Sequence, residues 1–243
     1  MFGDMFFFCI MNKHLLSTLV ISVLVLCCAP PDNYIIRGNA DGTFDGDTVY
    51  LFYSKDGKEK TIANYSIVTD GTFAFSGYTE GENIYYLGHM RDGDDVSTLF
   101  FLEKGEMQAC LKDGSVTGTP LNDTNRRVSD SIWRMIQEIN TLETRLINRV
   151  NRSSDDIMHD GITMYALQER LYSYLKRVVT ENIGNIYGLF MLVMYNGLFN
   201  EEEFDSILSR IPARYAGCDN NSLYRTAMEI KALKAEEAFP TEP

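Results

Sequence analysis

Short alternating or apolar segments, separated by turn-forming pairs, make up the first half of the chain. Thr72-Phe73-Ala74-Phe75 alternates polar and apolar residues, as a strand with one buried face does. Asp-Gly pairs at 56–57 and 70–71 favour tight hairpins because glycine tolerates a positive φ. The pattern predicts strands at residues 34–37, 48–53, 60–69, 72–75, 84–90, 98–102 and 107–111.

From residue 122 onward the apolar residues follow a helical period instead. Between Val128 and Val150 they recur on one face of a helix, with charged residues elsewhere. The polar run Ser153-Ser154-Asp155-Asp156 predicts a break before a second helix at about residues 163–180. Asn200 and Glu203 have the spacing of a helix N-cap and its reciprocal partner. Further helices are predicted at 187–195, 201–209 and 222–236.

These patterns predict an α+β protein. An N-terminal antiparallel β-sandwich or barrel is followed by a C-terminal α-helical domain. The expected boundaries are a signal peptide at 1–28, an antiparallel β domain at 33–121, a helical domain at 122–238 and a tail at 239–243.

The start of the chain has the layout of a signal peptide. Residues 15–26 form an apolar run that follows Lys13 and His14 and precedes two cysteines. The run is too short to cross a bilayer, which takes about 20 residues. Val25-Leu26-Cys27-Cys28 resembles a bacterial lipobox, in which the signal is cut before a cysteine that receives lipid. We expect lipidation at Cys28, with a cut before Cys27 or an uncleaved N-terminal anchor as alternatives.

Composition and charge narrow the classes of partner. A hydrophobic share of 45% over 243 residues predicts a packed core. The net charge of -12 argues against a nucleic-acid partner, because phosphate binding needs a basic face. The acidic surface mainly implies solubility of the folded part.

No assembled catalytic set is visible in the sequence. The histidines at 14, 89 and 159 are scattered over the signal, a strand and a loop, without the clustered spacing of a metal site. Neither a Gly-x-Ser-x-Gly elbow nor a phosphate-binding glycine loop occurs. Glu80 and Glu82 lie in a hydrophilic setting and are expected to be solvated. We therefore expect no catalytic residue, metal ligand or cofactor.

The sequence leaves open a calcium site at two groups of aspartates and a disulfide between two cysteines. Asp residues at 41, 45 and 47, or at 92, 94 and 95, could offer oxygen ligands to calcium, although neither group matches an EF-hand loop. Cys110 and Cys218 could pair in an oxidising envelope, although their separate contexts favour two thiols. The chain has no Cys-x-x-Cys pair and thus no thioredoxin-type redox motif of its own.

Tyrosines of the strand region are the candidate ligand-binding residues. Tyr53, Tyr85 and Tyr86 could bind a sugar or a peptide strand if they face outward. Packing in the core and across strands explains the same residues, and we favour that interpretation.

Several segments resemble a known family. Phe101-Leu102-Glu103-Lys104-Gly105, followed by Val116-Thr117-Gly118-Thr119-Pro120-Leu121-Asn122-Asp123, resembles the N-terminal domain of unknown function in Bacteroidetes envelope lipoproteins. The segment 69–77 is similar to that family's earlier turn-and-strand signature. Glu181-Asn182 with Gly188 is similar to the start of its later buried helix. The resemblance extends from about residue 33 to the end, and its motifs are structural.

The resemblance implies a cellular location and does not specify an activity. In that family the domain usually precedes a thioredoxin-like module of the thiol-disulfide oxidoreductase or peroxiredoxin type, and Ala238-Phe239-Pro240 looks like the linker before it. The family's redox cysteines have no matching positions here. We expect a lipoprotein anchored in the bacterial cell envelope, with its folded part periplasmic or surface-exposed. It would act as a non-catalytic binding or scaffold module for an envelope protein, peptide or glycan. The alternative is the accessory part of a membrane-anchored thiol-disulfide oxidoreductase.

Overall fold

The computed structural model describes residues 32–40, 45–54, 59–91, 94–148, 152–217 and 221–238, without the side chains of 90, 91, 94–96, 237 and 238. The predicted signal peptide with Cys28, the loop residue Cys218 and the predicted tail lie outside the described residues. Asn33–Pro243 form one compact unit, and the description below concerns that unit.

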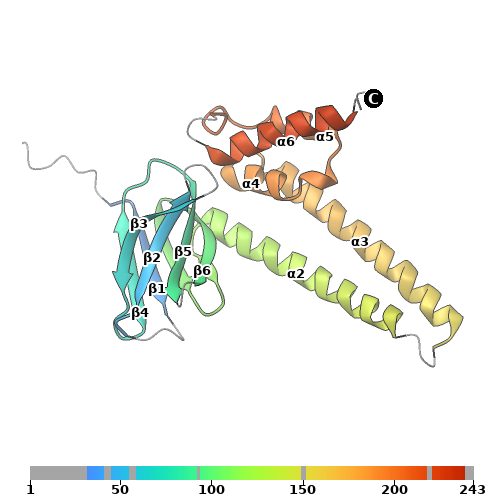
Figure 1. The fold of residues 1–243 in the computed structure, drawn as a ribbon, viewed down its shortest axis with the longest axis horizontal. Coiled ribbons are helices and arrows are strands. Elements are labelled where there is room, and N and C mark those ends of the chain that lie inside the picture. Colours follow the sequence, from blue (N-terminus) through green and yellow to red (C-terminus); the bar gives the residue numbers. More distant parts are fainter. Residues whose placement is uncertain are drawn as a thin grey trace, which may run out of the picture. The chain divides into compact units, whose positions relative to one another are not determined.

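The described strands form two four-stranded sheets that pack as a β-sandwich (Figure 1). The first has the order β4-β1-β7-β8, with β1 at Tyr34–Asn39, β4 at Thr72–Gly77, β7 at Gly105–Cys110 and β8 at Ser115–Thr117. The second has the order β3-β2-β5-β6, with β2 at Thr48–Ser54, β3 at Lys60–Ile67, β5 at Asn83–Arg91 and β6 at Asp94–Leu102. The predicted sandwich is thus confirmed.

One pairing departs from the antiparallel expectation. β1 pairs antiparallel with β4 but parallel with β7, so that Tyr34 lies opposite Gly105. A parallel pair needs a long connection. Here the strands of the second sheet lie between β1 and β7 in the sequence. The alternation of single strands does not reveal strand direction, and the other ladders of the described strands are antiparallel.

The two sheets enclose one hydrophobic cluster. In β1 buried and exposed residues alternate strictly, as expected for a strand with one face against a core. The buried members of the cluster are Tyr34, Ile36, Ala40, Val49, Leu51, Val68, Phe73, Phe75, Leu87, Phe100, Leu102, Met107, Ala109 and Val116.

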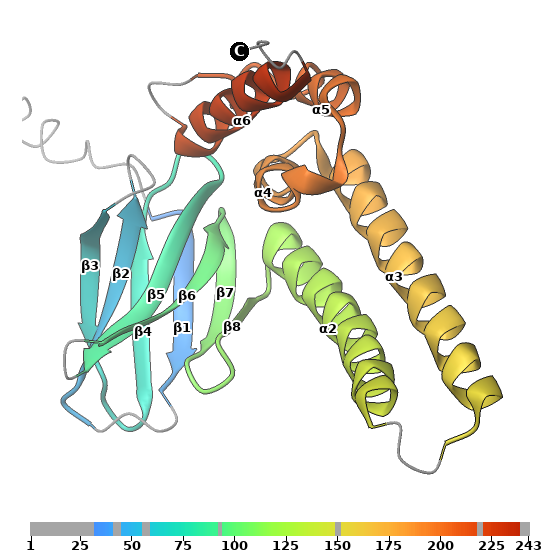
Figure 2. The same cartoon turned by 45° about the vertical axis from the view of Figure 1, so that its right-hand side comes forward.

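Two long helices follow the sandwich. α2 at Pro120–Ile147 and α3 at Ser154–Asn182 lie side by side as a hairpin (Figures 1 and 2). The expected break between the two helices is present, but it lies before residue 154 and not at 153–156, because α3 begins at Ser154 and not near residue 163. Ser153 accepts a hydrogen bond from the Asp156 backbone N–H at 3.1 Å and so caps the helix. Asp155 and Asp156 lie in the first turn, where negative charge favours a helix.

A buried carboxylate holds the far end of the hairpin. Asp160 of α3 lies 2.8 Å from an Arg145 guanidinium nitrogen of α2 and 2.7 Å from one of Arg152. Its side chain is 3% exposed, so the two cations compensate a charge that burial would otherwise penalise.

The remaining helices pack near the end of α3. They are α4 at Ile186–Met194, a short 3-10 turn at Asn196–Leu198, α5 at Glu201–Leu208 and α6 at Ser222–Ala238. α4 is the buried helix that the apolar run predicted. At α5 the predicted pairing is confirmed, because Asn200 and Glu203 bond reciprocally to each other's backbone. None of the helices in the described ranges combines the length and apolar character that a membrane span requires.

The side chain of Asn122 connects the sandwich to the first turn of α2. β6 is an edge strand, and the Asn122 amide of α2 pairs with its exposed edge as a neighbouring strand would. Asn122 Oδ1 accepts from the Phe101 N–H at 2.9 Å, and Nδ2 donates to the Phe101 carbonyl at 2.6 Å. Nδ2 also donates to Thr119 Oγ1 at 2.8 Å. Asn122 is 1% exposed, so its hydrogen bonds form out of contact with water.

The residues around Asn122 complete this joint. Thr119, the N-cap of α2, makes no side-chain cap bond, and the Leu121 N–H donates instead to a Glu103 carboxylate oxygen at 2.9 Å. Burial raises the pKa of Glu103, while hydrogen bonds from Thr119 and the Leu121 backbone oppose the shift. Gly118 has a φ of +98°, and a Cβ there would lie 2.7 Å from the Glu106 carbonyl oxygen. This position therefore requires glycine.

The joint directs one strand residue into the helical core. Phe101 is fully buried and packs edge-on against the rings of Tyr187 and Phe190 in α4, with centroid distances of 5.4 and 5.7 Å. Ile84 and Leu99 of the same sheet pack against the hydrophobic cluster that the helices form together with Phe101. The second sheet thus has the sandwich core on one face and helices on the other.

We expect Asn122→Ala to lower the free energy of unfolding by about 2–4 kcal/mol, because it leaves the Phe101 backbone groups buried without partners. Urea unfolding followed by circular dichroism measures the change. Asn140→Ala is the matched control, since Asn140 is an exposed residue of the same helix. Its effect should stay within about 0.5 kcal/mol. Equal unfolding midpoints for the two variants would contradict the role assigned to Asn122.

Candidate ligand-binding site

A cleft of about 630 Å³ lies between the second sheet and the helices α4 and α6; we call it the tyrosine cleft. Figure 2 shows the N-terminal end of α6 above the end of this sheet. Its strand residues are Tyr53, Ser54, Asn83, Ile84, Tyr85, Tyr86 and Leu99. Its helical side is lined by Phe190, Met194, Asn221, Ser222, Leu223 and Thr226.

The pairing of two strands places the three predicted tyrosines at the cleft. β2 ends where β5 begins, so Tyr53 lies opposite Tyr85 and Phe52 opposite Tyr86. The Tyr53 and Tyr85 rings are 6.1 Å apart, tilted by 42°. Successive strand residues point to opposite faces, so Tyr85 and Tyr86 do not share one face. All three nevertheless line the cleft, because it lies at the end of the sheet.

The tyrosines differ in their surroundings. Tyr85 packs partly against the sandwich core, and its ring lies 6.4 Å from that of Phe100. Burial raises the pKa of Tyr85, and the neighbouring Tyr53 adds to the shift, so its hydroxyl stays protonated at neutral pH. The Lys60 ammonium lies 4.7 Å from the centre of the Tyr86 ring. Tyr85 can therefore donate a hydrogen bond to a ligand, whereas Tyr86 is already in contact with a cation.

Ser54, at the end of β2, carries a polar atom without a partner. Its Oγ is buried and makes no hydrogen bond within the described part of the chain. Buried polar atoms in native proteins are almost always hydrogen-bonded, and leaving one unpaired costs free energy. Because this oxygen has no surface open to solvent, a bound molecule could reach it only after the Ser54 side chain rotates toward the cleft.

The helical wall contributes a helix start and two apolar side chains. Asn221 caps α6, its Oδ1 accepting from the backbone N–H groups of Leu223 and Tyr224 at 3.1 and 3.3 Å. Phe190 and Met194 come from α4. None of the described residues that line the cleft is charged, so its chemistry is that of hydroxyls, amides and apolar surface.

Sequence reasoning found the three tyrosines but missed the rest of the cleft. Ser54 has no local signal that distinguishes it from other strand-end serines. The apolar period of 187–195 predicted a buried helix, which gives no sign that Met194 is 59% exposed. Asn221 before Ser222 has the pattern of a helix N-cap, and that pattern could have marked the start of α6.

The other candidate sites of the sequence are not assembled in the described part of the chain. No group of three or more metal-binding side chains occurs among those residues. Asp45 bonds to the Asp70 and Gly71 N–H groups at 3.1 and 3.0 Å and so holds the β3–β4 turn. The side chains of Asp41, Asp92, Asp94 and Asp95 lie outside the description.

Glu82 differs from its expected solvated state. It is half-buried and accepts a hydrogen bond from the Tyr215 hydroxyl, which links the loop before β5 to the segment after α5. The local sequence is hydrophilic, and the partner lies 133 positions further along the chain. Cys110 ends β7 half-buried. The expectation that Cys110 and Cys218 are two unpaired thiols stays a prediction, because Cys218 lies outside the described residues.

The comparisons with known proteins identify a domain. Residues 34–125 match a family described as "Domain of unknown function (DUF4369)", which confirms the recognised N-terminal domain of unknown function. The match covers the sandwich and the first turn of α2 with Asn122, and it stops before most of the helical part. Comparison with curated proteins and with solved structures gives no match.

Proposed function

We propose that this protein is a lipid-anchored binding module of the bacterial cell envelope, which holds an uncharged ligand in the tyrosine cleft. The observation that carries the proposal is a cleft of about 630 Å³ whose described walls combine aromatic rings with hydroxyl and amide side chains. Binding sites combine apolar walls with a few polar groups that fix orientation. The tyrosine cleft has that composition.

The chemistry of the walls favours binding over catalysis. Proton transfer in enzymes usually relies on imidazole, carboxylate or amine groups, and the described lining residues carry none. The protonated Tyr85 hydroxyl supplies a donor, and the aromatic rings supply flat apolar surface. A glycan or a peptide offers acceptors beside apolar faces, so either class fits this cleft.

The anchor follows from the first residues of the chain. A lipid on Cys28 would leave a brief tether before β1 at Tyr34, so the folded part would remain close to a membrane on its periplasmic or outer side. The proposed module would therefore collect its ligand near a membrane surface.

Cys28→Ala is expected to release the protein from membranes in its own host, because a diacyl anchor would no longer form. Fractionation of cells into membrane and soluble parts, followed by immunoblotting, measures the shift. Cys27→Ala should remain in the membrane fraction, since it leaves the acceptor cysteine in place. Retention of Cys28→Ala at the wild-type level would contradict lipidation at Cys28.

Native mass spectra of the protein extracted from its own membranes are expected to show a bound small molecule. Tyr85→Ala should lower the occupied fraction or weaken binding about tenfold or more, because truncation of an aromatic anchor typically costs more than about 1.4 kcal/mol. Tyr65→Ala is the control, as Tyr65 is 64% exposed on β3 and does not line the cleft. An equal loss of the adduct in both variants, or no adduct in the wild type, would refute binding at the cleft.

A further inference from the structure

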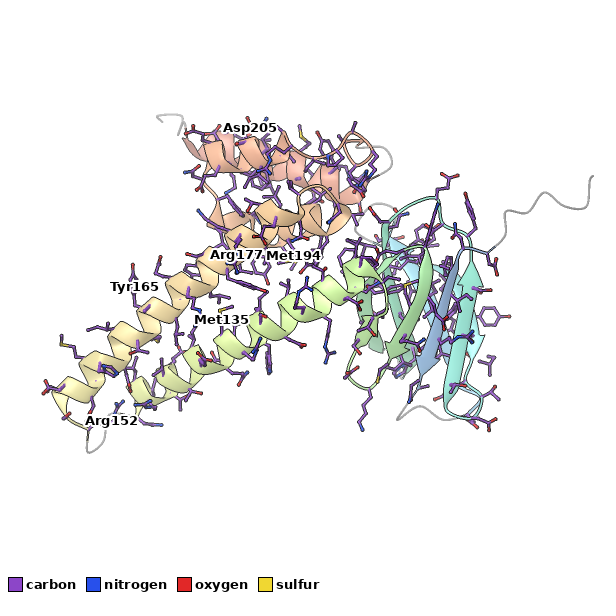
Figure 3. All side chains as sticks on the ribbon, turned by 180° about the vertical axis from the view of Figure 1, so that it is seen from behind. Met135, Arg152, Tyr165, Arg177, Met194 and Asp205 are labelled. Carbon is purple, nitrogen blue, oxygen red and sulfur yellow. The ribbon has the colours of Figure 1, made fainter. Side chains whose placement is uncertain are left out.

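A second groove, of about 260 Å³, lies next to the tyrosine cleft. The two share three wall residues, Leu99 of β6 with Phe190 and Met194 of α4. From there the second groove passes between α4 and α2, where Met191 and Ile132 contribute to its walls. We call it the methionine groove. Met194, which is labelled in Figure 3, lines both cavities.

The methionine groove differs chemically from the tyrosine cleft. Its walls are dominated by apolar side chains, among them Val128, Ile132 and Met191, and no described lining residue is charged. Methionine side chains are flexible and adapt to ligands of irregular shape. One end of the combined cavity therefore offers hydroxyl and amide groups, while the other offers apolar surface.

Each part of the cavity has one unpaired polar atom in its wall residues. Besides Ser54 Oγ in the tyrosine cleft, the buried side-chain atom without a hydrogen bond among the described residues is the Tyr187 hydroxyl. Tyr187 lines the methionine groove and is fully buried. Burial also raises the pKa of Tyr187, so the hydroxyl remains a neutral donor. Both atoms belong to lining residues of the two cavities, but neither atom has surface open to solvent.

We propose that the ligand of the tyrosine cleft is a neutral amphiphile. Its hydroxyl- or amide-bearing head lies among Tyr53, Tyr85 and Ser54, and its apolar chain passes Met194 into the methionine groove. This inference rests on the proposed binding function and specifies the class of ligand. No described lining side chain is charged, so the described walls offer no direct partner for an ionic head, and a buried charge needs a partner. The polarity gradient along the cavity fixes the direction of the molecule.

A series of n-alkyl β-glucosides tests the chain, with calorimetry on the whole protein and every member kept below its critical micelle concentration. Each added CH₂ should raise the affinity about three- to fourfold while it is buried, and the gain should stop once the groove is filled. Affinity that does not change with chain length would overturn the amphiphile. The absence of binding across the series would overturn it as well.

Two variants distinguish the groove from unspecific association. Met194→Arg places a charge at the junction and should abolish the gain with chain length. Met158→Arg is the matched control, because Met158 is 66% exposed on α3 and lines neither cavity, whereas Met194 is 59% exposed. It should retain the full gain. Loss of the gain in both variants, or in neither, would contradict a chain that passes Met194.

A third variant separates this inference from the proposed function. Tyr85→Ala should lower affinity by a similar factor at every chain length, since the head of each glucoside occupies the same cleft. If the native adduct persists while the glucosides bind without regard to chain length, the binding function stands and the amphiphile fails. If the native adduct is also missing, the binding function itself fails.

Discussion

The bond pair between the Asn122 amide and the Phe101 peptide is the interaction on which the rest of the structure depends. A side-chain amide has the same donor and acceptor as a backbone peptide, so it can complete the open edge of β6 without another strand. The same residue lies in the first turn of α2. A single side chain therefore ends the sheet and fixes the position at which the helical part starts.

The consequences extend from that joint to the cleft. Phe101 is held with its ring against Tyr187 and Phe190, which places α4 over the outer face of the second sheet. The Tyr215 hydroxyl bonds to Glu82 and ties the segment after α5 to the loop before β5. The tyrosine cleft lies between these two contacts, and its walls come from the end of the sheet, α4 and α6. The cleft exists because the two layers are connected at two separate places.

Much of the local structure could be predicted because it depends on neighbours in the sequence. The alternation of residues 72–75 predicted a strand, and the Asp70-Gly71 pair predicted the turn before it. The spacing of Asn200 and Glu203 predicted a capping box. The same local reasoning misjudged Ser153–Asp156, since a polar run can end one helix or cap the next. The sequence also contained Asn122 within the segment 116–123 that resembles a known family, but nothing in that segment says that its partner is Phe101.

The cleft could be predicted only in part, because its walls come from distant segments. Tyr53, Tyr85 and Tyr86 are conspicuous as strand aromatics, whereas Ser54, Met194 and Asn221 acquire their role only when β2, α4 and α6 come together. The parallel pairing of β1 with β7 was missed for a similar reason, since direction depends on the path of the whole chain. The hydrophobic periodicity of one segment does not show which distant strand it pairs with or in which direction.

The most direct measurement is a crystal structure of the protein purified from its own membranes without a delipidating step. The binding account predicts density for an organic molecule in the tyrosine cleft, in contact with the rings of Tyr53 and Tyr85. A cleft that holds only ordered water would contradict it.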